Sequence, residues 1–120
     1  MNNKELFLKQ NNVDVETSVE NMIDFDTYYE ILQDFYNTID TIIEQLTNFK
    51  NAKDMANYAI EVHALKSNAR SLGFQEMGEL AYSHELKSKE NDSTYIENDF
   101  HHLIDEIMKM KKIIEDCINL

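Results

Sequence analysis

The sequence predicts an all-α protein, an antiparallel up-down-up-down four-helix bundle with a short N-terminal helix. Among its 120 residues there is no proline and there are only two glycines, whereas a sheet protein of this size needs many turn residues. Apolar residues recur at spacings of three and four along several stretches, which is the pattern of amphipathic helices. The connections between these stretches are short, and short connections make successive helices antiparallel neighbours.

The N-terminal part is expected to contribute only a short helix. Residues 1–12 are polar and rich in asparagine, so we expect a flexible lead-in or linker, followed by one helical domain over 13–120. Asp14 can cap a short helix over about 15–22, because an aspartate side chain accepts hydrogen bonds from the first free N–H groups of a helix.

The next stretch predicts one long helix that begins at Asp26, its expected N-cap, and extends to about Asn48. At 100° per residue its apolar side chains form one broad stripe, and polar side chains occupy the opposite face. The stripe consists of Tyr28, Leu32, Phe35, Tyr36, Ile39, Ile42, Ile43, Leu46 and Phe49.

Two more helices are expected after short connections. Asp54 can cap a helix over about 55–72. Gly73 is expected to end it, because glycine adopts positive φ without a clash at Cβ. A fourth helix is expected from about 74 to 90.

The final helix begins close to a polar turn. Thr94 and Glu97 have the spacing of a capping box, although Asp92 or Ser93 can serve as the cap instead. Apolar residues at spacings of three and four then continue to Ile118.

Charge and composition restrict the classes of partner. The 11 basic and 23 acidic residues give a formal net charge of −12, which repels nucleic acids and anionic membrane surfaces. We therefore expect no nucleic-acid partner and no direct membrane contact. One cysteine, Cys117, cannot form an internal disulfide, and no signal peptide or apolar run of ~20 residues is evident, which favours the cytoplasm. A monomer is expected, because one bundle uses every apolar stripe.

The most informative residue is a histidine on the third long helix. Helical spacing places His63 on the side opposite the core stripe, with Ala56 and Ala59 beside it and the cations Lys66 and Arg70 within two turns. A neutral imidazole has a ring nitrogen that can attack phosphorus, and nearby cations offset the charge of a phosphoryl group. The alternative is a solvated histidine with ordinary charged neighbours.

The segment HALKSNARSLG resembles the signature of histidine-containing phosphotransfer (HPt) domains. That signature has a histidine, any residue, leucine, lysine, glycine or serine, and a glycine after five further residues. The matching positions here are His63, Leu65, Lys66, Ser67 and Gly73. The resemblance extends over about residues 13–118, since HPt domains are also four-helix bundles with a short N-terminal helix.

The resemblance implies a phosphorelay carrier. His63 would be the phosphoacceptor, which takes a phosphoryl group from a receiver-domain aspartate and passes it to another receiver. The implied partners are the receiver domains of a hybrid histidine kinase and of a response regulator. Such a carrier is not an enzyme, and the chain has no glycine-rich loop for a nucleotide. No cofactor is implied for this chain, because Mg²⁺ would belong to the partner receiver.

The resemblance also implies roles for other residues. Lys66 would be the charge partner of the phosphoryl group. Glu85 lies 22 positions after His63, where the family often has a carboxylate or glutamine, and would orient the imidazole. Ser67 would be the small residue that permits close approach of a receiver. We expect the receiver-docking face to consist of Ser67 together with Arg70, Ala59 and Ala56, which helical spacing places on the His63 side of the helix.

The remaining histidines are expected to have structural or surface roles. His84 occupies a position that is commonly apolar in the family, and we expect a partly buried, hydrogen-bonded histidine at the edge of the bundle. A second phosphorylation site is the alternative. His101 and His102 point about 100° apart and lie four residues before acidic side chains, which favours surface ion pairs over a metal site.

Two other functions remain open on the sequence alone. The bundle could be an adaptor that binds a partner helix and makes no chemical use of His63, or a phosphotransfer domain of the chemotaxis-kinase type. Incubation with a phosphorylated receiver separates the carrier from the adaptor.

Overall fold

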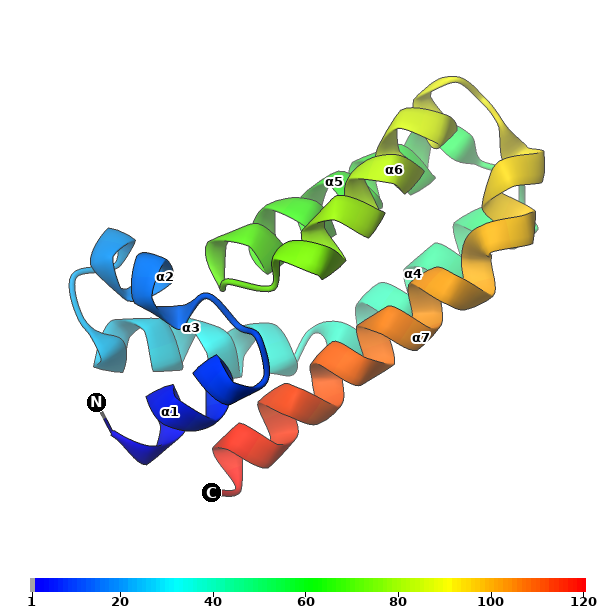
Figure 1. Ribbon diagram of the computed structural model, residues 1–120. Coiled ribbons are helices and arrows are strands. Elements are labelled where there is room, and N and C mark those ends of the chain that lie inside the picture. The colour runs from blue at the N-terminus through cyan, green and yellow to red at the C-terminus, as the bar shows by residue number, and fades with distance from the viewer. Residues whose placement is uncertain (1) are drawn as a thin grey trace.

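The computed structural model describes residues 2–120, and this part of the chain contains seven helices and no strand (Figure 1). The all-α prediction is confirmed. The helices are α1 (Asn3–Gln10), α2 (Val15–Asn21), α3 (Phe25–Tyr36), α4 (Ile39–Asn51), α5 (Met55–Ser71), α6 (Gln75–Lys89) and α7 (Ser93–Ile118).

The four helices α4 to α7 form a closed ring of contacts. α5 and α6 lie side by side, α4 packs on α5 and α7, and α6 packs on α7 (Figure 1). The short helices α1 to α3 gather at one end of this elongated molecule of 44 × 24 × 20 Å. No helix within residues 2–120 combines the length and the apolar character needed to cross a membrane.

Most helices begin at an aspartate or asparagine whose side chain accepts a hydrogen bond from the N–H three residues later. The predicted caps Asp14 and Asp54 are confirmed, and Asp92 is the cap of α7. The prediction of Asp26 was wrong, because Asp24 caps α3 through the N–H of Thr27 at 2.8 Å.

The long helix predicted from Asp26 to Asn48 is two helices. α3 ends at Tyr36 and α4 begins at Ile39. Both the N–H and the hydroxyl of Thr38 donate to the carbonyl of Phe35, at 2.9 and 2.7 Å, which tightens this turn into an i to i−3 pattern. The apolar periodicity continues across the break and therefore conceals it.

The N-terminal residues differ from the expected flexible lead-in. Residues 3–10 form α1, and the side chain of Leu8 is fully buried in the core. The ammonium of Lys4 donates to the carbonyls of Cys117 and Ile118 at 2.9 and 3.3 Å. This interaction attaches α1 to the end of α7, where orphan carbonyls need donors.

Gly73 ends α5 as predicted and also permits a close backbone approach. Its φ of +92° lies in the region that favours glycine, and its carbonyl accepts a hydrogen bond from the N–H of Asp14 at 2.9 Å. A Cβ atom at this position would lie 2.6 Å from the carbonyl oxygen of Asp14. Glycine therefore connects the α5–α6 turn to the start of α2.

Candidate functional site

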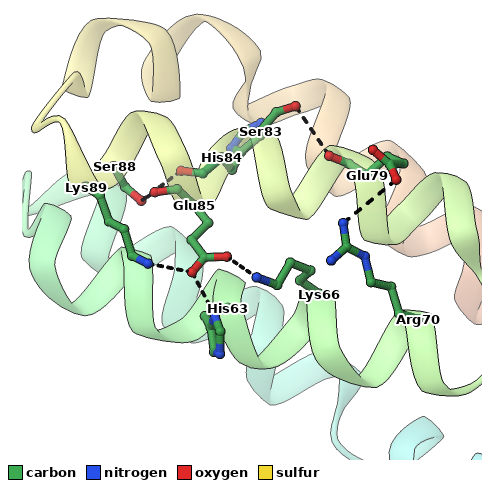
Figure 2. Close-up of polar contacts among 9 residues, drawn as sticks. All are labelled: His63, Lys66, Arg70, Glu79, Ser83, His84, Glu85, Ser88 and Lys89. Carbon is green, nitrogen blue, oxygen red and sulfur yellow. Dashed lines mark hydrogen bonds and ion pairs between the residues drawn. The ribbon is translucent and has the colours of Figure 1, made fainter.

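His63 lies on the exposed side of α5, and its side chain is 57% exposed. Its Nδ1 atom lies 2.7 Å from Oε2 of Glu85 on the neighbouring helix α6 (Figure 2). The second ring nitrogen points away from Glu85. One nitrogen is thus engaged by the protein, while the other lies toward solvent.

Glu85 is a buried carboxylate with three donors. Its side chain is 2% exposed, and besides His63 it accepts hydrogen bonds from Nζ of Lys66 at 2.6 Å and from Nζ of Lys89 at 2.8 Å (Figure 2). Burial would raise the pKa of Glu85, but the hydrogen bonds from Lys66, Lys89 and His63 outweigh it and lower the pKa to about 2. Glu85 is therefore ionised at neutral pH.

The ionised carboxylate determines which tautomer of His63 is present. A carboxylate oxygen can only accept, so a neutral imidazole must place its proton on Nδ1 to make this hydrogen bond. Nε2 then carries a lone pair and no proton. The structure brings together His63, Lys66 and Glu85, as the resemblance implied, and leaves the lone pair of a neutral imidazole on the nitrogen that points away from Glu85.

Lys89 is a further member of the site that was not predicted from the sequence. Its side chain is 60% exposed and pairs with Glu85 one helical turn earlier on α6. The signal was available, because a glutamate four residues before a lysine is the favourable order for a pair on one helix face. Without the position of Glu85 beside His63, however, this pair resembles any other surface ion pair.

The structure does not bring Arg70 to His63. The stem of Arg70 crosses α6 at Gly78, where an added Cβ would lie 2.7 Å from the arginine Cγ. Its guanidinium lies 5.3 Å from the ring centroid of Tyr82 and pairs with Glu79 at 3.8 Å. Figure 2 shows Arg70 reaching from α5 across to Glu79 on α6, with no contact drawn to His63. The docking-face assignment of Arg70 therefore lacks support from proximity to His63.

An open groove of about 610 Å³ begins at His63 and follows α5 and the end of α6. Ala56 and Ile60 are exposed on it, while Ala59 is 6% exposed and forms part of its floor. Ser67 is exposed one turn further along α5, outside the groove. The lining residues are Met55, Ala56, Ala59, Ile60, His63, Glu85, Ser88, Lys89 and Asn91.

The other histidines have different surroundings. His84 is 0% exposed and lies in the core, so the expected position at the edge of the bundle was wrong, while its hydrogen bonding is confirmed. His101 and His102 are exposed on α7, and Nδ1 of His102 lies 3.4 Å from Asp99. Within residues 2–120 no three histidine, cysteine or acidic side chains are grouped so that they could hold a metal ion.

Comparison with known proteins gives one match. The family model described as the Hpt domain matches residues 30–112, which is well over half of the chain and includes both His63 and Glu85. No match was found among curated proteins or among solved structures.

Proposed function

The chain belongs to the Hpt domain family, whose members transfer phosphoryl groups through a histidine in two-component signalling, and from that premise we propose that His63 is the phosphoacceptor. In this proposal His63 accepts a phosphoryl group from the aspartate of one receiver domain and passes it to the aspartate of another. The protein is a carrier and not an enzyme, because the phosphoryl group stays on its own side chain between the two transfers.

One observation carries this proposal. The His63 imidazole donates from Nδ1 to a buried, ionised carboxylate, while its other nitrogen lies exposed beside an open groove. A nucleophilic imidazole needs one nitrogen protonated and oriented and the other free. An adaptor that makes no chemical use of His63 needs neither feature.

The transfer step requires no proton to leave the imidazole. The Nε2 lone pair attacks phosphorus, the N–P bond forms, and the bond from phosphorus to the donor aspartate oxygen breaks, so that the aspartate leaves as a carboxylate. Nδ1 keeps its proton, and Glu85 balances the positive charge that the ring acquires. The second transfer is the same step in reverse, to another receiver.

The lysines support this step through charge. Lys66 and Lys89 both bind Glu85, so the four groups already carry a net positive charge with His63 neutral, and this charge increases when the ring becomes cationic. We propose that Lys66 is the charge partner of the phosphoryl group, since a dianionic group on Nε2 attracts nearby ammonium groups. Any Mg²⁺ in the reaction belongs to the receiver, and this chain needs no cofactor.

The groove beside His63 is the proposed receiver-docking site. Ala56 and Ala59 leave room for an approaching surface, and the exposed side chain of Ile60 offers an apolar contact. Ser67 on the other side of His63 is small enough to permit the same approach. The partners are receivers of a hybrid histidine kinase and of a response regulator, and the compartment is the cytoplasm.

The contacts among the helices also support a proposal for their arrangement. We propose that α4 to α7 act as the antiparallel up-down-up-down bundle, because each of them contacts two others of the set. A monomer is proposed, since the helices of a single bundle bury their apolar faces against one another.

The test is phosphoryl transfer from a receiver labelled on its aspartate. The parent chain should acquire a label that acid removes and base does not, as expected for phosphohistidine. His63→Gln should acquire none, while His101→Gln, an exposed histidine on α7, should label like the parent. An unlabelled parent would favour the adaptor, and a labelled His63→Gln would place the acceptor elsewhere.

A further inference from the structure

The buried histidine His84 connects three helices through its two ring nitrogens. Its Nδ1 lies 2.8 Å from the hydroxyl of Tyr58 on α5, and its Nε2 lies 2.9 Å from Oδ2 of Asp99 on α7. Tyr58 and His84 are both fully buried, and the Asp99 side chain is 28% exposed. The residue thus connects α6 to both of the helices that flank it.

The direction of each hydrogen bond follows from the chemistry. The carboxylate of Asp99 accepts, so Nε2–H of His84 donates to it, and Nδ1 accepts from the hydroxyl of Tyr58. Burial lowers the pKa of His84, although the hydrogen bond and charge of Asp99 oppose this shift. Neutral His84 therefore satisfies every polar atom of the group, and the described side chains contain no buried polar atom without a partner.

His84 is the neighbour of Glu85 in the sequence, which couples the two sites. Successive residues of a helix point about 100° apart, so the rotation of α6 that seats His84 between Tyr58 and Asp99 also directs Glu85 toward His63. A side-chain end lies about 5–6 Å from the helix axis, and a rotation of about 20° moves it by about 2 Å. Such a rotation would break the 2.7 Å contact between Glu85 and His63.

The other contacts of Glu85 do not define this rotation. Lys66 and Lys89 have long, flexible side chains that can follow the carboxylate over such a distance. The hydroxyl of Ser88 donates to the carbonyls of both His84 and Glu85 within α6 itself, so it moves with the helix. A hydrogen bond across helices depends on angle as well as distance, so His84 is the polar contact next to Glu85 that resists rotation, in addition to the apolar packing of α6.

We propose that His84 is a positioning residue for phosphotransfer, which fixes the rotation of α6 so that Glu85 holds the reactive tautomer of His63. This inference rests on the proposed function of His63 and adds a residue to it. Under this proposal a core contact that does not itself line the groove determines the transfer rate.

The test removes the directional contacts while it keeps the core filled. In the double variant with His84→Leu and Tyr58→Phe, α6 keeps an apolar contact and no buried hydroxyl loses its partner. His84→Gln is the conservative variant, because an amide presents one acceptor and one donor about a single carbon, as a neutral imidazole does. His101→Gln is the matched control, a histidine-to-glutamine change on the surface.

Two measurements are made on each variant. The ¹⁵N shifts of the His63 ring at pH 8.5 report which nitrogen carries the proton, without any partner protein. The initial rate of transfer from a labelled receiver reports function. We expect the double variant to show mixed His63 tautomers and transfer at least about tenfold slower, since small misplacements of reacting groups cost up to about 100-fold. His84→Gln and His101→Gln should keep the parent tautomer and rate.

Each outcome decides the proposal. A folded double variant with the parent tautomer of His63 and the parent rate would overturn it, as would a folded His84→Gln that fails to restore either one. If the double variant does not fold, Tyr58→Phe alone decides by the same readouts, because it breaks only the Nδ1 contact. A parent chain that takes no label defeats the proposed function, whereas the tautomer measurement still decides the role of His84.

Discussion

Two histidines on adjacent helices show how surroundings give one side chain two different uses. His63 on α5 has one ring nitrogen bound to Glu85 and the other exposed beside the groove. His84 on α6 is fully buried, and both of its ring nitrogens are hydrogen-bonded. A nucleophile needs a free lone pair, so His63 has the surroundings of a reactive group and His84 those of a structural one.

The carboxylates that bind these two histidines also differ in their burial and in their neighbours. Glu85 is buried and surrounded by Lys66, Lys89 and His63, so its charge is compensated. Asp99 is partly exposed and contacts His84 and the surface residue His102. Cationic neighbours therefore accompany the histidine that would carry a phosphoryl group, and not the histidine that stabilises the core.

The largest expected effect is a difference in the free energy of unfolding between variants of the two histidines. His84→Ala should lower the free energy of unfolding by about 3 kcal/mol or more, because it leaves a cavity and deprives the buried Tyr58 hydroxyl of its partner. His63→Ala should change it by less than about 0.5 kcal/mol, since the side chain is largely exposed. Urea unfolding of both variants measures this difference. Equal losses would mean that His63 is a core residue too.

The next effect concerns the carboxylate that holds His63. Glu85→Ala should slow transfer from a labelled receiver by about tenfold to a hundredfold, because the tautomer and orientation of the imidazole are no longer fixed. Glu79→Ala on the same helix is the control, since Glu79 pairs with Arg70 at 3.8 Å and makes no contact with His63 among the described residues. A parent rate in Glu85→Ala would remove the carboxylate from the mechanism.

His84 and Glu85 should affect the free energy of unfolding in two separate pH ranges, or windows. His84 has an ordinary pKa of 6.5 that is lowered in the folded state, so stability should decline as pH falls below about 6.5, where the unfolded chain binds a proton and the folded one does not. The pKa of Glu85 is lowered from 4.5 to about 2 in the folded state. The stability that Glu85 contributes is therefore present above pH 4.5 and is lost as pH falls toward 2.

Urea unfolding between pH 8 and pH 2 measures both windows. His84→Gln should flatten the decline below pH 6.5 and leave the acid window in place. Glu85→Gln should reduce the loss in the acid window and leave the decline below pH 6.5 in place. Asp24 and Asp54, whose pKa values are also lowered by their capping hydrogen bonds, still contribute to the acid window. If either change flattens both windows, the two groups titrate as one coupled unit and the comparison between them fails.

The smallest effect compares the two lysines on Glu85. Lys66→Met should reduce the transfer rate several-fold and Lys89→Met by about twofold, because Lys66 is 13% exposed and Lys89 is 60% exposed, and solvent weakens an exposed ion pair. Initial rates at two salt concentrations measure this, since the Lys89 effect should also decrease with added salt. A larger effect from Lys89 would make it the charge partner of the phosphoryl group.

The sequence predicted local features of the fold well where a single residue type determines them. Asp14, Asp54 and Gly73 mark helix ends because capping and positive φ depend on the residue itself. The break at Thr38 was missed because it depends on one side chain competing for a backbone carbonyl, while the apolar stripe continues through it. α1 was missed because a single buried residue, Leu8, gives almost no periodic signal.

The site was predictable to the extent that it is local to α5. Helical spacing places His63 outward, and the resemblance to HPt domains links it to Lys66 and Glu85. The direction of Arg70 was not predictable, because it depends on Gly78 of another helix, which leaves space for the arginine stem. The burial of His84 depends in the same way on Tyr58 and Asp99, which lie on helices far away in the sequence.

The attachment of Lys4 to the last carbonyls of α7 has a consequence for how this domain can be tethered. It brings the two ends of the chain to one tip of the elongated molecule, while the groove lies toward the opposite tip, near the turn between α6 and α7 (Figure 1). A fusion partner, surface anchor or affinity tag joined at either end therefore leaves the groove unobstructed. Immobilising the domain by its termini should preserve receiver binding.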